Sequence, residues 1–300
     1  MKSILALIRL MRPTQWVKNG FVVMPLIFSG HLQVYEDVVR ALGVMAAFCL
    51  ASSATYIFND YVDREQDRAH PVKRRRPLAS GETSAWAALL LMSALLVAAL
   101  AVVVFLVGRT ESIVLLLSYL GLQVLYSFLL KNIVILDVLS IATGFLLRVL
   151  AGASAISVGV SSWLILCTFS LATLLALGKR RHEVVILNND ATNHRPVLEN
   201  YNVAFLDQLL QISTTSTFIF YCLYSVRGNP DVGIASEKMM LTIPLVTYGI
   251  FRYLYLVYHK GDGGSPTNLL LNDAPLLVCT IIWLVACVGI IYFTFPGPLP

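Results

Sequence analysis

Four side chains whose oxygen atoms could bind a metal are clustered at the end of one apolar stretch of the sequence. Asn59, Asp63 and Asp67 are separated by four residues each, and Asp60 lies one step away. On a helix that continues from the apolar stretch, this spacing places the first three on one face. Carboxylates stacked in this way repel one another unless a cation lies among them. We therefore predict that these four residues bind a divalent metal. Mg²⁺ is the preferred ion, because it completes its coordination shell with substrate phosphates.

A run of four bases follows the acidic residues: Lys73, Arg74, Arg75 and Arg76. Such a run could be no more than an anchor that fixes the orientation of a membrane protein. Next to an acidic metal site, however, bases are well suited to bind phosphate oxygens, and arginine does so with bidentate geometry. We interpret the run as the binding site for a phosphorylated donor that carries a diphosphate.

A second polar cluster occurs near the middle of the chain: Lys179, Arg180, Arg181, His182 and Glu183. Lys179 and Glu183 are four residues apart and share a helical face, whereas Arg180 points elsewhere. The balance of charge here is basic, so we expect direct contacts with a second phosphorylated group, made by Lys179, Arg180 and Arg181.

Ionisable residues inside apolar segments are costly in a membrane and are candidates for function. Asp137 and Arg148 are eleven residues apart, which places them on one helical face about 16 Å from each other. They could line a polar cavity together with Tyr126, Lys131 and Glu183. The alternative, that Asp137 and Arg148 each bond only to a neighbouring helix, has equal weight at this point.

The elements that position these residues follow from the composition. Hydrophobic residues make up 57% of the 300 residues, charged residues only 13%, and the mean hydropathy is +0.75. A soluble domain has about a quarter charged residues, so most of this surface must face lipid. The net charge of +5 is better explained by membrane orientation than by nucleic-acid binding. The five cysteines form no C-x-x-C pair and indicate neither zinc nor disulfides.

Nine apolar segments are long enough, or nearly so, to be membrane spans, which need about 20 residues each. The sequence thus predicts an all-α bundle in one domain over residues 1–300, with site segments at 59–84 and 179–199. The predicted spans are Val17–Ser29, Val38–Phe58, Ala85–Val107, Ser112–Leu130, Ile133–Ile156, Ser161–Gly178, Phe205–Val226, Met239–Tyr258 and Pro275–Phe295. With a cytoplasmic N-terminus, 17 of the 22 bases lie on the cytoplasmic side, which favours that orientation.

The stretch Asn59–Asp67 reads N-D-x-x-D-x-x-x-D and resembles the first aspartate-rich motif of the UbiA superfamily of intramembrane prenyltransferases. Further stretches resemble one branch of that superfamily, which transfers phosphoribosyl groups. These stretches lie at 11–25, 59–81, 126–155, 175–183 and 252–273, so the resemblance extends along most of the chain.

The resemblance implies a UbiA-type bundle whose active site faces the cytoplasm in the inner membrane. Prenyl-transferring members carry a second D-x-x-x-D motif, where this sequence has Lys179–Glu183. One acidic site suits one metal-bound diphosphate, and a basic site suits a lipid monophosphate. The resemblance therefore implies 5-phosphoribosyl 1-diphosphate as donor, a decaprenyl-like polyprenyl phosphate as acceptor, and Mg²⁺ as cofactor. Asp63, Asp67 and Lys179 are then the expected catalytic residues.

Two other functions remain open from the residues alone. A prenyltransferase that joins an isoprenyl diphosphate to an aromatic or other small acceptor would use the same first motif. A transporter or anion-binding membrane protein would also place charges at the ends of spans, but the sequence lacks clear paired spans interrupted by Gly or Pro.

Overall fold

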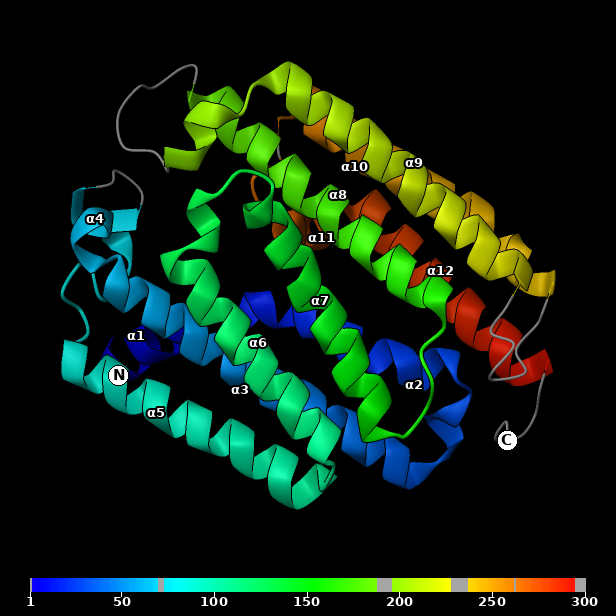
Figure 1. Ribbon diagram of the computed structural model, residues 1–300, viewed down its shortest axis with the longest axis horizontal. Coiled ribbons are helices and arrows are strands. Elements are labelled where there is room, and N and C mark those ends of the chain that lie inside the picture. Colours follow the sequence, from blue (N-terminus) through cyan, green and yellow to red (C-terminus); the bar gives the residue numbers. More distant parts are fainter. Residues whose placement is uncertain (1, 70–72, 188–195, 228–236, 262, 295–300) are drawn as a thin grey trace.

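The structure, a computed structural model, describes residues 2–69, 73–187, 196–227, 237–261 and 263–294, and the regular structure in these ranges is helical (Figure 1). Eight helices or helix pairs in this part of the chain are long and apolar enough to cross a membrane. They are α3 (Tyr35–Val62), α5 (Ala85–Ala101) with its π-helical extension η4 (Val102–Val107), α6 (Thr110–Phe128), α7 (Leu136–Ala155), α8 (Ser162–Leu187), α9 (Val203–Arg227), α10 (Ile243–His259) with the preceding η8 (Glu237–Thr242), and α12 (Ala274–Thr294).

Shorter helices connect these spans. They are α1 (Lys2–Met11), η1 (Pro13–Val23), α2 (Met24–Phe28), η2 (His31–Gln33), α4 (Arg64–Ala69), η3 (Lys73–Arg75), η5 (Leu130–Asn132), η6 (Pro196–Asn200) and α11 (Pro266–Asn272). The predicted all-helical membrane fold is confirmed, and so are eight of the nine predicted spans. Parts of both predicted site segments, 70–72 and 188–195, lie outside the described residues.

The remaining predicted span, Val17–Ser29, which is the first along the chain, is not one continuous α-helix. It falls in the 11-residue 3₁₀ helix η1 and the five-residue α2. Pro13 begins η1 and Pro25 lies in the first turn of α2, and each lacks the backbone N–H that one continuous helix would need there. The segment nevertheless extends along the bundle, antiparallel to α3. Arg12 contacts Asp60 near the C-terminal end of α3, Asn19 contacts Ser52 in its middle, and His31 contacts Asp37 near its start.

Helices α3 and α7 form the centre of the bundle. In the most apolar window of α3, 67% of the residues are buried, and the value for α7 is 61%, against 22% for α5, α6 and α12. Figure 1 shows α3, α5 and α6 on one side of the molecule and α8, α9 and α10 on the other. Outer helices expose large apolar side chains such as Trp86, Phe105 and Phe293, as expected of surfaces that face lipid.

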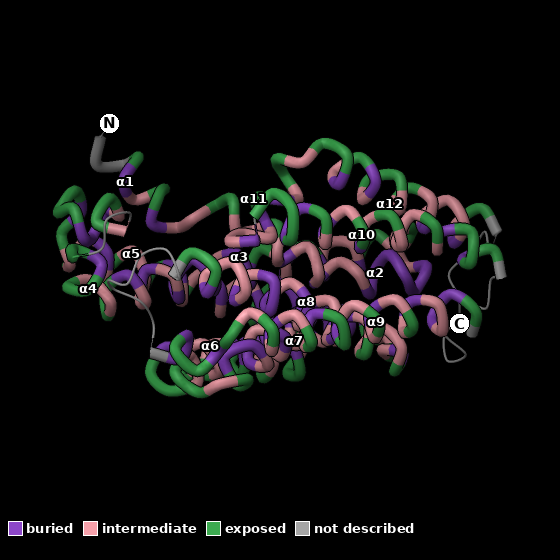
Figure 2. The backbone as a smooth tube through the Cα atoms, turned by 90° about the horizontal axis from the view of Figure 1, so that it is seen from above, coloured by how far each residue is buried: buried purple, intermediate pink, exposed green. Residues whose placement is uncertain are grey.

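Close packing of η1 and α2 against α7 depends on small residues. A Cβ atom added at Gly152 of α7 would lie 1.8 Å from the Val22 carbonyl oxygen, so only glycine permits this approach of the two backbones. Residues Pro25–Phe28 of α2 are all buried, which Figure 2 shows as a continuous purple stretch.

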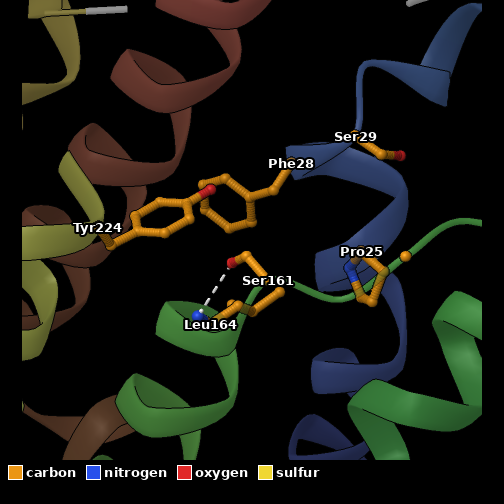
Figure 3. Close-up of a pocket in the computed structure, with 7 residues that line it drawn as sticks. Pro25, Phe28, Ser29, Ser161, Leu164 and Tyr224 are labelled. Atoms are coloured by element: carbon orange, nitrogen blue, oxygen red, sulfur yellow. Dashed lines mark hydrogen bonds between the residues drawn. The ribbon is translucent and has the colours of Figure 1, made fainter. Parts of the chain in front are cut away.

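The C-terminal end of α2 packs against α8 and α9, from the other half of the bundle. Phe28 packs edge-to-face on Tyr224 of α9, with 5.8 Å between the ring centroids (Figure 3). Ser161 and Leu164 at the start of α8 line the same small pocket, and no charged residue does. We therefore assign this pocket to packing, and the chemistry to the opposite end of α3.

Candidate active site

The acidic motif lies where α3 ends and α4 begins. Helix α3 stops at Val62 and α4 starts at Arg64, so the continuous helix predicted through the motif is interrupted at Asp63. Asp60 and Asp67 are both only 2% exposed. Their carboxylates converge on one guanidinium nitrogen: Arg76 Nη1 lies 3.0 Å from Asp60 Oδ1 and 2.6 Å from Asp67 Oδ2.

Asn59 and Asp63 face different neighbours, the end of α6 and the short helix η5 that follows it. Ser127 Oγ donates a hydrogen bond to Asn59 Oδ1, and Lys131 Nζ lies 3.2 Å from Asp63 Oδ1. The predicted common face of Asn59, Asp63 and Asp67 is thus divided, because Asp67 faces Arg76 together with Asp60 and the other two residues do not. The division follows from the interrupted helix.

Arg12 contacts the acidic motif from the segment between α1 and η1. In the sequence it was counted only among the bases that favour a cytoplasmic N-terminus. It has φ 51° at the junction of α1 and η1, and this left-handed conformation changes the chain direction there. Its guanidinium lies 2.5 Å from Asp60 Oδ1 and 5.0 Å from the centre of the Tyr56 ring. Asp60 therefore has two arginine partners.

The donor set is suited to a divalent cation. All three carboxylates of the motif contact a cationic side chain, and two of them share a single nitrogen of Arg76. Two carboxylates that close on one positive atom provide the charge and the oxygen ligands that Mg²⁺ uses. Within the part of the chain that the structure describes, no three His, Cys, Asp or Glu residues form a compact metal-binding group. A metal would therefore also need the Asn59 amide oxygen or substrate oxygens.

The second cluster lies on the last turns of α8. Arg180 is fully buried and has three partners: Asp137 at 2.5 Å, Glu183 at 2.5 Å and the Tyr126 hydroxyl at 3.2 Å. It therefore points into the bundle, where protein side chains contact all three of its guanidinium nitrogens, whereas the sequence pattern assigned Arg180 to a phosphorylated group.

The other two bases of this cluster also have carboxylate partners. Lys179 lies 3.8 Å from Glu183, which confirms their shared face. Arg181 contacts Asp207 at 2.6 Å, and its guanidinium lies 4.2 Å from the centre of the Tyr258 ring. The cluster that looks basic in sequence is thus balanced by acids from α7, α8 and α9.

The end of α6 and the following η5 contact both clusters. Tyr126 contacts Arg180, its neighbour Ser127 contacts Asn59, and Lys131 contacts Asp63. In Figure 1, α4 and the C-terminal end of α8 accordingly lie toward the same end of the molecule. The structure therefore brings together both motifs and four of the predicted cavity residues, namely Tyr126, Lys131, Asp137 and Glu183.

Arg148, the remaining predicted cavity residue, lies elsewhere. It is 5% exposed and donates to Asn19 Oδ1 at 2.7 Å, to the Gly144 carbonyl at 2.8 Å and to the Tyr119 hydroxyl at 3.0 Å. Asp137 pairs with Arg180, so the two ionisable residues of α7 bond separately to neighbouring elements. Of the predicted donor-binding bases, Arg74 and Arg75 are exposed, and Lys73 is partly buried beside them on η3.

Tyr201 supports the buried Asp137. Its hydroxyl donates to Asp137 Oδ1 and accepts from the Ile135 backbone N–H, both at 2.7 Å. Ile135 has φ 70°, an unfavourable value for a β-branched residue, and this hydrogen bond helps to hold it. Burial raises the pKa of Tyr201, so its hydroxyl remains a proton donor.

A polar cavity of about 430 Å³ next to α8 was missed by the sequence reasoning. It is lined by His182, Leu256, Lys260, Gly264, Ser265, Asn268, Leu269, Asn272 and Asp273. Hydrogen bonds from Arg252 lower the pKa of Asp273, so the cavity contains an ionised carboxylate at neutral pH. The signal available in the sequence was the run of small and polar residues at 263–268, whose Gly263 and Gly264 lie beside His182 of α8 in the folded chain.

Residues 22–272 match the UbiA prenyltransferase family. The chain is 32% identical over 299 residues to a decaprenyl-phosphate phosphoribosyltransferase of Mycolicibacterium smegmatis, covering 96% of this chain and 93% of the relative. A decaprenyl-phosphate phosphoribosyltransferase of Corynebacterium glutamicum is 28% identical, with 95% of this chain and 86% of the relative covered.

The fold is also similar to that of solved structures. A UbiA homologue from Archaeoglobus fulgidus, solved with GPP and Mg²⁺, superposes with a TM-score of 0.71 at 19% identity, covering 95% of this chain and 99% of the homologue. The sequence match and the bundle agree, and this multi-pass membrane protein belongs to the UbiA prenyltransferase family.

Proposed function

We propose that this protein transfers the 5-phosphoribosyl group from 5-phosphoribosyl 1-diphosphate to a polyprenyl phosphate, and releases diphosphate. The observation that carries the proposal is the similarity, over nearly the whole chain, to relatives named decaprenyl-phosphate phosphoribosyltransferase. In this reaction an oxygen of the lipid phosphate bonds to the anomeric carbon, and the bond from that carbon to the diphosphate breaks. A single displacement of this kind inverts the anomeric centre.

Asn59, Asp60, Asp63 and Asp67 are the residues that would hold Mg²⁺. The metal would stabilise negative charge on the departing diphosphate. The Mg²⁺ in the Archaeoglobus homologue supports divalent-metal use in this family. In the described structure Arg76 and Lys131 compensate the carboxylates, so a bound metal would release both side chains to contact phosphate oxygens. Asp63 and Asp67 are the catalytic residues of this site.

The exposure of the basic side chains indicates which of them could contact a substrate. Arg74 and Arg75 are exposed beside the acidic motif, and with Lys73 and Arg76 they are suited to bind the donor phosphates. In the second cluster the Lys179 side chain is 42% exposed, whereas Arg180 is 1% and Arg181 is 15% exposed. We therefore assign contact with the lipid phosphate chiefly to Lys179, and a supporting role to the two arginines.

The active site would face the cytoplasm from the inner membrane. Arg9 pairs with Glu82 and Arg12 with Asp60, so the basic N-terminal segment lies at the same end of the bundle as the acidic motif. With that end inside, most of the bases are cytoplasmic, as the positive-inside rule requires. A water-soluble sugar diphosphate would reach the site from the same side.

Two incubations of the purified protein test the reaction. The first contains labelled 5-phosphoribosyl 1-diphosphate and polyprenyl phosphate, and the second contains polyprenyl diphosphate and an aromatic acid. We expect labelled lipid product in the first only, and its loss when EDTA removes Mg²⁺. Product in the second alone would replace the proposal with aromatic prenyl transfer. Product in neither, with ligand flux in vesicles, would indicate a transporter.

Asp63→Asn tests the metal site. We expect turnover to fall about 10²-fold or more, because one charged ligand near the leaving group is lost. Glu111→Gln removes an exposed carboxylate at the other end of α6 and should leave turnover unchanged. Both variants should melt near the wild-type temperature. Normal turnover in Asp63→Asn would remove Asp63 from the catalytic residues.

A further inference from the structure

Lys18 and Arg148 lie within the bundle without a carboxylate partner among the described residues. Arg148 is 5% exposed, and its three hydrogen-bond acceptors are all neutral. Lys18 on η1 is partly buried and forms no hydrogen bond or ion pair with the described residues. The positive charges of Arg148 and Arg12 are close enough to Lys18 to repel its ammonium group. Arg12 is compensated by Asp60, so the uncompensated charge belongs to Lys18 and Arg148.

The contrast with Arg180 shows that this arrangement is unusual within the same protein. Arg180 is as deeply buried as Arg148, but two carboxylates contact it. A buried cation without a counter-ion is costly, and in a membrane protein it indicates a site for an anion. The side chains around Arg148 are neutral and orient its guanidinium without supplying a counter-charge; they are Asn19, Phe48, Tyr119 and Phe145.

The remaining donors of Arg148 suit an oxyanion. Three of the five N–H groups of a guanidinium are used by Asn19, Gly144 and Tyr119, which leaves two for a ligand. The ammonium group of Lys18 adds up to three donors. Irregular backbone such as η1 is tolerated at membrane depth where it lines a polar site, and η1 contributes both Lys18 and Asn19.

Lys18 and Arg148 lie at a different depth in the bundle from the acidic motif. Asn19, which holds Arg148, also contacts Ser52, two helical turns before Asp60 on α3. This separation is about 12 Å along the helix axis. A ligand at Lys18 and Arg148 would thus lie deeper in the bundle than a diphosphate at the acidic motif.

We propose that Lys18 and Arg148 bind a phosphate monoester group of one of the two substrates. Such a group carries a charge of about −1.5 to −2 at neutral pH, which matches two uncompensated cations. Both substrates of the proposed reaction contain one: the 5-phosphate of the donor and the phosphate of the lipid acceptor. The inference rests on the proposed function for the identity of the ligand, and the experiment below keeps the two apart.

The binding test needs no turnover. Purified protein without Mg²⁺ is melted with increasing ribose 5-phosphate, and separately with geranyl phosphate. We expect one of the two to raise the melting temperature of the wild type. Lys18→Gln and Arg148→Lys should each need at least tenfold more of it for half of the effect. Arg109→Gln, which removes a cation next to the start of α6, at the end of that helix away from Ser127, is the matched control and should behave as wild type.

The kinetic test identifies the source of the phosphate. If the site binds the donor, Lys18→Gln should raise the KM for 5-phosphoribosyl 1-diphosphate at least tenfold and leave the KM for lipid phosphate unchanged. If it binds the acceptor, the reverse is expected. Wild-type responses of both variants to both monoesters would overturn the inference. A third outcome separates the two proposals. If a monoester stabilises the wild type but not Lys18→Gln, and the protein transfers no phosphoribosyl group, the site is supported and the proposed function is refuted.

Discussion

Replacement of Arg180 by Gln should destabilise the protein because it leaves the carboxylate of Asp137 buried without its cation. Asp137 is 0% exposed, and Arg180 is its sole ion-pair partner among the described residues. Breaking a buried pair by removing one member costs about 3–5 kcal/mol. The Tyr201 hydroxyl still donates to Asp137, so we expect a loss near the lower limit, about 3 kcal/mol. That loss is a factor of about 100 in the ratio of folded to unfolded protein.

The double variant Asp137→Asn with Arg180→Gln provides the matched comparison. With both charges removed, no carboxylate remains buried alone, so its loss of stability should be smaller than that of Arg180→Gln. The protein contains its own reporters of unfolding, because the free thiols of Cys49, Cys279 and Cys287 are buried. A thiol-reactive fluorophore should therefore label each variant as it melts in detergent.

The expected order of melting temperatures is wild type, then the double variant, then Arg180→Gln. A double variant less stable than Arg180→Gln would refute the charge argument. If Arg180→Gln melts like the wild type and only its KM for lipid phosphate rises, Arg180 binds the substrate directly.

Two further substitutions test packing and surface charge. Gly152→Ala should lower the yield of folded protein strongly, since its Cβ would overlap the Val22 carbonyl oxygen, whereas Gly121→Ala has open space and should be tolerated; size-exclusion profiles would compare them. Arg252→Gln should lower the melting temperature at pH 7, because Asp273 loses the partner that depresses its pKa. That difference should shrink as the pH falls below about 4, because the unfolded chain then binds a proton at Asp273 before the folded protein does; an equal difference at pH 3 would contradict this assignment.

The apolar segments of the sequence were sufficient to predict eight spans, because membrane helices need long runs of apolar residues. The same criterion misjudged Val17–Ser29 as a regular helix. Val22, Leu26, Ile27 and Phe28 are buried, but Pro25 interrupts the segment, and Lys18 and Asn19 are polar. Hydropathy measures burial and cannot distinguish an α-helix from a 3₁₀ helix followed by a short turn of α-helix.

The candidate site was predictable in its residues and not in its pairings. Spacing identified the acidic motif because i, i+4 neighbours share a helical face. The partners of these acids lie far away in sequence: Arg12 is 48 residues from Asp60, and Lys131 is 68 residues from Asp63. Arg180 likewise meets Asp137 across 43 residues. Local periodicity contains no information on such contacts, so the neutralisation of the second cluster appeared only in the structure.

The irregular first segment has a consequence for biogenesis. A 3₁₀ stretch with Lys18 and Asn19 in it is a poor candidate for independent insertion into lipid, where every exposed polar group is costly. Its Asn19 side chain finds its partners on α3 and α7, and the contact at Gly152 requires α7 to be present. We expect the segment to dock after those two helices have entered the membrane. A segment synthesised before α3 and α7 would then reach its final place after them.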